Sequence, residues 1–170
     1  RYKKIINEFI SVFPFVSETK IIEASKLGVY MPGIVPVFSI KEKFSNNWIP
    51  LHEISSGMKK VLLILCDIMT LPDEGGIYLI DEYENSLGVS AINFFPTILL
   101  SGNNESQFII TSHHPYIIGN VPVKDWIVFH RKGNQVKTKQ GFELEERFGK
   151  SKQKSFIQLI NDPFFTEGVE

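Results

Sequence analysis

Three short polar clusters contain residue types that act on phosphates or metal ions. Each cluster stands at one end of an apolar segment, and the three clusters are Ser55-Ser56-Gly57, Asp81-Glu82 and His113-His114. Hydroxyls and amides at a helix start bind phosphate, a carboxylate holds magnesium, and a histidine donates or titrates near neutral pH. These residue types predict chemistry on a phosphate compound, provided that the fold brings the clusters together.

The Ser55-Ser56-Gly57 cluster precedes the clearest predicted helix. Apolar residues recur at three- and four-residue steps from Met58 to Met69, and further apolar residues between them predict burial on most sides. A serine before the helix can cap it by accepting a hydrogen bond from a free amide of the first turn. Gly57 leaves the same amides open to a phosphate. A capped helix without any ligand is the competing interpretation.

The Asp81-Glu82 pair comes directly after Ile77–Ile80, an apolar run typical of a strand covered on both faces of a parallel sheet. Ligands of open α/β sheets bind at the carboxyl ends of such strands. If the strand continued, the two side chains would point to opposite faces, and one carboxylate would address magnesium while the other addressed water. A polar strand end that begins a loop is the competing interpretation.

The His113-His114 pair follows a predicted strand at Gln107–Thr111. A histidine in this place could donate to a phosphate oxygen or titrate near neutral pH. Adjacent histidine side chains diverge and the spacing supplies no third ligand, so the pair is a weak indication of a metal site. An exposed loop pair is the competing interpretation.

The remaining elements give the chain an α/β order. Further predicted helices cover Tyr2–Phe13, Ser90–Leu100 with a break at Pro96, and a final segment at Phe156–Ile160. Further predicted strands cover Lys20–Leu27, Val35–Lys43, and the hairpin of Trp126–His130 and Gln135–Lys139. Because strands and helices alternate through the middle of the chain, we expect an α/β fold with a mixed sheet.

The composition excludes several other classes of protein. The 170 residues are 43% hydrophobic and 22% charged, which indicates a globular domain and not a disordered chain or a coiled coil. The net charge of −1 gives no overall attraction to nucleic acid or to an anionic membrane. The single cysteine, Cys66, excludes an internal disulfide, and no apolar run is long enough to span a bilayer. We therefore expect a cytoplasmic protein that does not bind a membrane.

The order of these motifs resembles that of ABC-class ATPase heads, in the SMC-like form of the AAA_21 type. The matching segments are Ile54–Met58 for the signature motif, Ile77–Glu82 for Walker B, Glu84–Leu87 for the D-loop and Thr111–Pro115 for the H-loop. The resemblance implies the C-terminal lobe of a P-loop NTPase, with a mainly parallel sheet, flanking helices and a C-terminal hairpin.

The resemblance also implies a role for each motif in the binding and hydrolysis of ATP. Glu82 would polarise the attacking water, His113 would touch the γ-phosphate, and Asp81 would hold Mg²⁺ through its water shell. Two further groups of residues would act across a homodimer of heads. The ATP held by the opposite subunit would be bound by Ser55, Ser56 and Gly57. The dimer interface would include Asn85 and Ser86. Hydrolysis would then depend on dimerisation, since phosphoryl transfer needs positioning and charge stabilisation above all.

Two motifs of the family do not occur in the sequence. It contains no G-x-x-x-x-G-K-[ST] phosphate loop and no recognisable Q-loop glutamine, and both lie upstream of the signature motif in the family. We therefore expect residues 1–170 to be a single partial domain whose N-terminal Walker A lobe is missing. This fragment alone is expected to be inactive. Gly88 also replaces a frequent histidine of the family, and His114 replaces the usual serine.

Three functions are consistent with these residues. The leading hypothesis is a non-transporter ATPase whose dimerisation gates an effector protein or DNA, in DNA transactions or phage defence. A metal-dependent nuclease that used Asp81, Glu82 and His113 or His114 would instead cleave without ATP. A non-catalytic docking module would tolerate any change at Glu82. Family analogy alone does not identify the partner.

Overall fold

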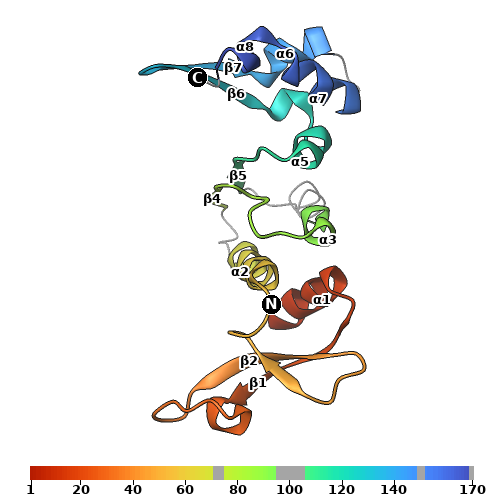
Figure 1. Cartoon of the computed structure of the whole chain (residues 1–170), viewed down its shortest axis with the longest axis vertical. Helices are drawn as coiled ribbons and strands as arrows, with labels where there is room; N and C mark the ends of the chain where they lie inside the picture. Colours follow the sequence, from red (N-terminus) through yellow and green to blue (C-terminus); the bar gives the residue numbers. More distant parts are fainter. Residues whose placement is uncertain (71–74, 95–105, 149–151, 169–170) are drawn as a thin grey trace. The chain divides into compact units, whose positions relative to one another are not determined.

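The structure is a computed structural model that describes residues 1–70, 75–94, 106–148 and 152–168. The chain divides into two compact units, Arg1–Ile110 and Thr111–Glu170, and each unit is described by itself. Figure 1 follows the elements of both units along the sequence, from the red N-terminal helix to the blue C-terminal helices.

A helix and an antiparallel sheet begin the first unit. The helix α1 (Tyr2–Val12) confirms the first predicted helix and ends before Pro14. The sheet contains β1 (Val16–Glu23), β2 (Pro36–Glu42) and β3 (Trp48–Pro50), in that spatial order. Ile40 in the central strand pairs with a residue on either side and is 1% exposed, so the core of this unit includes the middle of the sheet.

The boundaries of the first strand differ from the prediction. The sequence predicts a strand over Lys20–Leu27, whereas β1 begins at Val16 and ends at Glu23. Ala24–Leu27 forms the short 3-10 helix η1, which is closed by Gly28 in a left-handed conformation with φ 73°. Pairing with β2 determines where β1 begins and ends, because strand propensity depends strongly on the neighbouring strand. The second predicted strand, Val35–Lys43, is confirmed by β2.

The helix α2 (Ser56–Thr70) confirms the strongest periodicity of the sequence. Its buried side chains are Met58, Val61, Ile64, Leu65 and Ile68. Figure 1 shows α1 beside α2, and the two helices are in contact. The prediction of burial on most sides is wrong, because Leu63 is 61% exposed and Cys66 is only half-buried. Within this chain, α2 therefore keeps an open face.

Two short strands form the parallel sheet that ends at the candidate site. The strands β4 (Ile77–Ile80) and β5 (Gln107–Ile110) pair in parallel over four residues. Both strands were expected from their apolar runs, and both are confirmed. Parallel neighbours bring their carboxyl ends to the same edge, so the segments after Ile80 and Ile110 begin at one edge of this sheet.

The two faces of this parallel sheet differ in burial. On one face Ile80 is 7% exposed, and the Tyr78 and Phe108 rings meet at 6.0 Å between centroids. On the other face Ile77 is 68% exposed and Leu79 is 69% exposed. The sequence predicts cover on both faces, but the described residues cover only one of them.

A short helix, α3 (Val89–Ile92), follows the loop after β4. It forms the described beginning of the helix predicted at Ser90–Leu100. From residue 95 onward that predicted helix, with the break expected at Pro96, lies outside the described residues.

The second unit combines a hairpin with short helices. The hairpin strands are β6 (Ile127–Lys132) and β7 (Gln135–Gln140), which confirm the predicted hairpin. Gly133 lies in the turn with φ 60°, a conformation that suits glycine. The helical elements are α5 (Pro115–Asn120), η2 (Val123–Asp125), α6 (Gly141–Phe148), α7 (Lys152–Ile160) and α8 (Pro163–Thr166). Of these helical elements the sequence predicts only α7, which contains the expected segment Phe156–Ile160.

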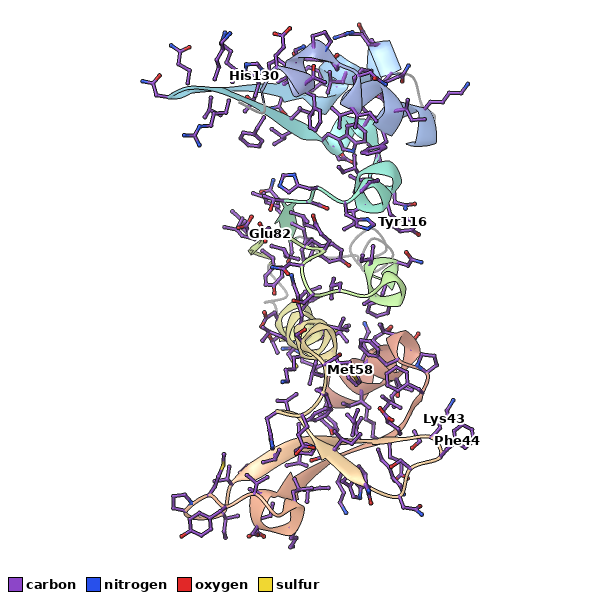
Figure 2. All side chains as sticks on the ribbon, in the orientation of Figure 1. Lys43, Phe44, Met58, Glu82, Tyr116 and His130 are labelled. Atoms are coloured by element: carbon purple, nitrogen blue, oxygen red, sulfur yellow. The ribbon has the colours of Figure 1, made fainter. Side chains whose placement is uncertain are left out.

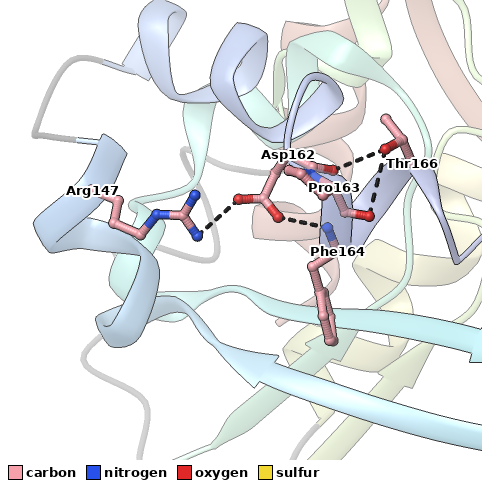
Figure 3. Close-up of polar contacts among 5 residues, drawn as sticks. All are labelled: Arg147, Asp162, Pro163, Phe164 and Thr166. Carbon is pink, nitrogen blue, oxygen red and sulfur yellow. Dashed lines mark hydrogen bonds and ion pairs between the residues drawn. The ribbon is translucent and has the colours of Figure 1, made fainter.

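An apolar cluster and one buried carboxylate hold the second unit together. The cluster contains Val123, Trp126, Val128, Leu144, Phe148 and Leu159. Asp162, which is 5% exposed, caps α8 by accepting a hydrogen bond from the Phe164 amide at 2.8 Å. Its other carboxylate oxygen lies 3.0 Å from Nη1 of Arg147 in α6, as Figure 3 shows. The cap and the ion pair together connect α8 to α6.

The α/β class is confirmed, although the sheets of the described residues are mixed in direction. Parallel pairing occurs between β4 and β5, while the other two sheets in the described part of the chain are antiparallel. Among the described helices, none is long and apolar enough to cross a bilayer.

Candidate functional site

The start of α2 is capped as the sequence predicts. The Met58 amide donates to Oγ of Ser55 at 3.2 Å, and the Lys59 amide donates to the Ser55 carbonyl at 3.0 Å. Ser55 is therefore the capping residue and Ser56 begins the helix. Both serines are exposed. The cap uses the Ser55 hydroxyl, whereas the Ser56 hydroxyl lies at the surface beside the positive end of the helix.

Asp81 and Glu82 are exposed directly after the end of β4. Glu82 has φ 45°, so the backbone turns into the left-handed region and the alternation predicted for a continuing strand does not apply. Ser86 in the same loop has φ 65°. Such a conformation costs a non-glycine residue about 1 kcal/mol, and it is concentrated at functional sites because surrounding contacts must hold it. Figure 2 marks Glu82 in this loop.

The loop after β4 closes on itself through short hydrogen bonds. The Asn85 amide donates to the Glu82 carbonyl at 2.9 Å, and the Leu87 amide donates to the Glu84 carbonyl at 3.0 Å. Nδ2 of Asn85 also lies 3.3 Å from Oε2 of Glu82. The carboxylate predicted to be catalytic is therefore in contact with a side chain predicted at the dimer interface.

A buried aromatic residue anchors this loop to the unit. Tyr83 is 1% exposed, and its hydroxyl lies 3.4 Å from the carbonyl oxygens of both Ala91 and Ile92. Leu87 is also buried. Because Tyr83 points inward, Glu82 before it stands at the surface of a fixed turn, whereas Glu84 after it is partly buried.

The beginning of α2 lies directly against this loop. A Cβ atom placed on Gly57 would be 2.5 Å from the carbonyl oxygen of Ser86, so only glycine allows this approach. One turn further along, Nζ of Lys60 donates to the Glu82 carbonyl at 2.9 Å and to the Asn85 carbonyl at 3.0 Å. The segments that resemble the signature motif and the D-loop are thus adjacent in space.

Sequence reasoning missed Lys60. The available signal was its position, since Lys60 follows Ser56 by four residues and therefore lies on the same face of a largely apolar helix. A lysine on that face has three donors that can reach a polar group beside the helix start. The identity of the partner could not be read from the sequence, because the two carbonyl groups belong to a loop more than twenty residues away.

A second polar link joins α2 to β4. The Tyr78 hydroxyl donates to Oδ2 of Asp67 at 2.6 Å. Burial, followed by the hydrogen bond and the negative charge of Asp67, raises the pKa of the Tyr78 phenol well above its usual value. The phenol therefore remains a hydrogen-bond donor throughout the neutral range. Lys60 and Asp67 together attach α2 to β4 and to the loop that follows it.

The two histidines differ in environment. Nδ1 of His114 accepts a hydrogen bond from the Tyr116 amide at 3.2 Å and so caps α5, while the His114 amide donates to Oγ of Ser112 at 3.1 Å. His113 is exposed. Both histidines belong to the second unit, whereas the contacts between α2 and the loop after β4 lie within the first unit.

The donor set of the first unit is compatible with a magnesium ion held by few protein ligands. Among the described residues, no group of three or more histidine, cysteine or acidic side chains is arranged to hold a metal. Magnesium often takes one or two carboxylates, with phosphate oxygens and waters as the other ligands. Asp81, an exposed carboxylate at the carboxyl end of a parallel strand, fits that requirement.

Comparisons with known proteins cover this part of the chain. The model of a family described as "AAA domain, putative AbiEii toxin, Type IV TA system" matches residues 17–119, which include the start of α2 and the loop after β4. No curated protein matches the chain.

Solved structures of SMC ATPases share the fold. A chain from work titled "Structural biochemistry of ATP-driven dimerization and DNA stimulated activation of SMC ATPases" is 15% identical, with a TM-score of 0.56 over 88% of this chain and 94% of that chain. An Smc head domain with a coiled coil and joint from Pyrococcus yayanosii is 14% identical, with a TM-score of 0.57 over 85% of this chain. An SmcHead bound to the C-winged helix domain of ScpA is also 14% identical, with a TM-score of 0.58. The match spans only 28% and 43% of these last two chains.

Proposed function

Because the chain belongs to the AAA_21 family of AAA domains, which its match over residues 17–119 shows, we propose that it is the C-terminal lobe of an SMC-like, ABC-type ATPase head. In this proposal the complete head binds and hydrolyses ATP and dimerises on it, and residues 1–170 form a partial domain. The observation that carries the proposal is the contact between the start of α2 and the loop after β4, through Gly57 and Lys60.

The proposed roles in one subunit follow from the placement of the acidic pair. Asp81 holds Mg²⁺ through its water shell, and the ion neutralises charge on the phosphates. Glu82 accepts a hydrogen bond from the attacking water and orients it toward the γ-phosphate. His113 contacts the γ-phosphate as a hydrogen-bond donor. The left-handed backbone at Glu82 and the hydrogen bond from Asn85 support a fixed position for this carboxylate.

The proposed roles across the dimer follow from the exposed helix start. Ser55, Ser56 and Gly57 bind the γ-phosphate of the ATP held by the opposite subunit, with the helix amides and the Ser56 hydroxyl as donors. Asn85 and Ser86 lie at the dimer interface, next to the same helix start. Neither subunit then has a complete site alone, so hydrolysis requires the dimer.

The open face of the parallel sheet supports a second lobe. Parallel sheets are normally covered on both faces, and here Ile77 and Leu79 remain more than two-thirds exposed. We propose that the Walker A lobe covers this face and supplies the phosphate-cradling loop that the 170 residues do not contain. The proposal places the assembled ATPase in the cytoplasm. It also predicts that the 170-residue chain alone does not turn over ATP.

The test is ATP hydrolysis and dimerisation of the full-length parent protein, comparing wild type with Glu82→Gln. We expect the variant to lose at least about 100-fold in kcat, because the attacking water loses its base, while ATP-bound dimers accumulate. The matched control is Glu18→Gln, which removes the same charge from an exposed site on β1. Equal hydrolysis by wild type and Glu82→Gln would exclude the assigned role of Glu82.

Two further assays of the same parent protein, DNA cleavage and ATP binding, separate the competing functions. Cleavage of DNA with Mg²⁺ in the absence of ATP would favour a metal-dependent nuclease. A parent protein that does not bind ATP would favour a non-catalytic docking module. The work on one similar structure concerns the DNA-stimulated activation of SMC ATPases, and the family description names a toxin of a type IV TA system. We therefore propose DNA or an effector protein as the partner of the dimer, and we expect added DNA to change the rate of ATP hydrolysis.

A further inference from the structure

We propose that Lys60 is a positioning residue for the hydrolytic reaction, because it holds the backbone of Glu82 against the helix that carries the phosphate-binding serines. This inference rests on the proposed ATPase function for its kinetic consequence. Its structural part concerns only residues of the first unit and can be tested without ATP.

The position of Lys60 allows it to bond two backbone carbonyl groups of the loop after β4. Its ammonium group lies 2.9 Å from the carbonyl oxygen of Glu82 and 3.0 Å from that of Asn85. A lysine ammonium group has three donors and can bond both carbonyls at once. The Glu82 carbonyl also accepts a hydrogen bond from the Asn85 amide at 2.9 Å. Lys60 is therefore a second, charged donor to a turn that this backbone hydrogen bond already closes.

The loop needs such an attachment because its backbone is strained. Glu82 and Ser86 both have positive φ, and each conformation persists only where neighbouring contacts determine it. α2 supplies contacts at both places, with Lys60 at the Glu82 carbonyl and Gly57 beside the Ser86 carbonyl. The helix start that would bind phosphate and the carboxylate that would orient water are thereby fixed to each other.

The adjacent lysine provides a matched control. Nζ of Lys59 donates to the carbonyl oxygen of His52 at 2.8 Å, so Lys59 also joins α2 to a backbone carbonyl. That carbonyl lies before the helix and not in the loop after β4. Lys59 and Lys60 therefore share their charge, their helix and the type of hydrogen bond, and they differ in the segment that they hold.

The structural test is amide hydrogen exchange of the full-length parent protein without ATP, comparing Lys60→Met with Lys59→Met. Methionine keeps most of the apolar stem and removes the donors. We expect Lys60→Met to raise exchange about tenfold or more at the Asn85 and Leu87 amides, since one charged hydrogen bond is typically worth about that factor. Lys59→Met should leave these two amides unchanged.

The kinetic test uses the full-length parent protein. We expect Lys60→Met to lower kcat by about 10- to 100-fold with little change in KM, because a displaced catalytic group affects the chemical step. Lys60→Arg should recover part of the loss, since it keeps a cationic donor, and Lys59→Met should behave as wild type. If Lys60 only stabilised the fold, Lys60→Met would lower the melting temperature without lowering kcat at a nearly unchanged KM.

The outcomes distinguish this inference from the proposed function. If the parent protein does not hydrolyse ATP, the function fails, and hydrogen exchange still decides whether Lys60 holds the loop. If the two lysine variants have equal exchange at Asn85 and Leu87, the positioning role is wrong. It is also wrong if kcat falls equally in both variants, or if it falls in Lys60→Met without any change in exchange.

Discussion

Two short turns of the molecule are held by charged side chains in opposite ways. The loop after β4 contains two left-handed residues, Glu82 and Ser86, and is attached to α2 by Lys60. The turn into α8 is fixed by the buried carboxylate of Asp162, which caps the helix and pairs with Arg147. In the second unit, every described residue other than Gly133 has negative φ.

The difference shows which turn is shaped for stability and which is shaped for a site. The turn into α8 uses favoured backbone conformations, a local cap and a carboxylate shielded from solvent. The loop after β4 accepts strain, keeps both carboxylates of the acidic pair exposed and depends on a distant helix. Strain of this kind is retained where a fixed geometry is needed. Substitutions at the first turn should therefore affect activity as well as stability, and those at the second turn should affect stability.

Among the substitutions that compare the two turns, the largest expected effect is that of Gly57→Ala. The added methyl group would lie 2.5 Å from the Ser86 carbonyl oxygen, so the loop or the helix must move. We expect a loss of about 1–3 kcal/mol in the free energy of unfolding and a fall of at least about tenfold in the ATPase activity of the parent protein. Urea unfolding and steady-state kinetics measure the two effects.

The control for Gly57→Ala is Gly88→Ala, in the same unit. A Cβ atom on Gly88 would have no neighbour within 4 Å, and the residue has φ −74°. This variant should stay within about 1 kcal/mol of wild type, the usual range for a residue at a helix start. Equal effects of the two substitutions would mean that the close approach of Gly57 to Ser86 is not important.

An intermediate effect is expected for Asp162→Ala in the second unit. The substitution removes the cap of α8 and the partner of Arg147, as Figure 3 shows, and should lower the free energy of unfolding by about 2 kcal/mol. Asp162→Asn keeps an oxygen for the Phe164 amide and should lose about half as much. Thermal unfolding of the three proteins distinguishes these values, and identical losses would show that the cap contributes nothing.

The smallest effect is expected for Ser86→Gly. Glycine adopts the left-handed conformation of this position without strain, so the chain should gain up to about 1 kcal/mol in the free energy of unfolding. Ser86→Ala is the control, because it removes the hydroxyl and keeps the strain. A loss of stability in Ser86→Gly, relative to Ser86→Ala, would contradict a strained backbone at Ser86.

The sequence predicts the elements of this chain where apolar spacing is regular. Long periodic segments such as α2 and the alternating hairpin strands are correct in type and place. Short elements were missed where local signals are weak, as in α6, whose charged residues suit a solvated surface as well as a helix. The prediction at Lys20–Leu27 failed because strand pairing, and not local pattern, sets the ends of β1.

The candidate site was predictable in its residue types and not in its internal contacts. The cap at Ser55 follows from local chemistry, and the exposure of the acidic pair follows from its position after a strand. The left-handed backbone of Glu82, the approach of Gly57 and the hydrogen bonds of Lys60 depend on how α2 meets a loop distant in sequence. Such contacts leave no spacing pattern in the residues themselves.

The central claim is that each ATP site is completed by the Ser55-Ser56-Gly57 cluster of the opposite subunit. The most direct test mixes two inactive forms of the parent protein, Glu82→Gln and Ser56→Arg. Ser56 is exposed, so arginine should block the phosphate surface without disturbing the core. In a mixed dimer, one site carries both defects and the other site carries neither.

We expect the equal mixture to recover about a quarter of wild-type ATPase activity, since half of the dimers formed at random are mixed and each has one intact site. Each variant alone should stay inactive at the same total concentration. A mixture as inactive as its components, under conditions in which mixed dimers are shown to form, would contradict a site shared between subunits.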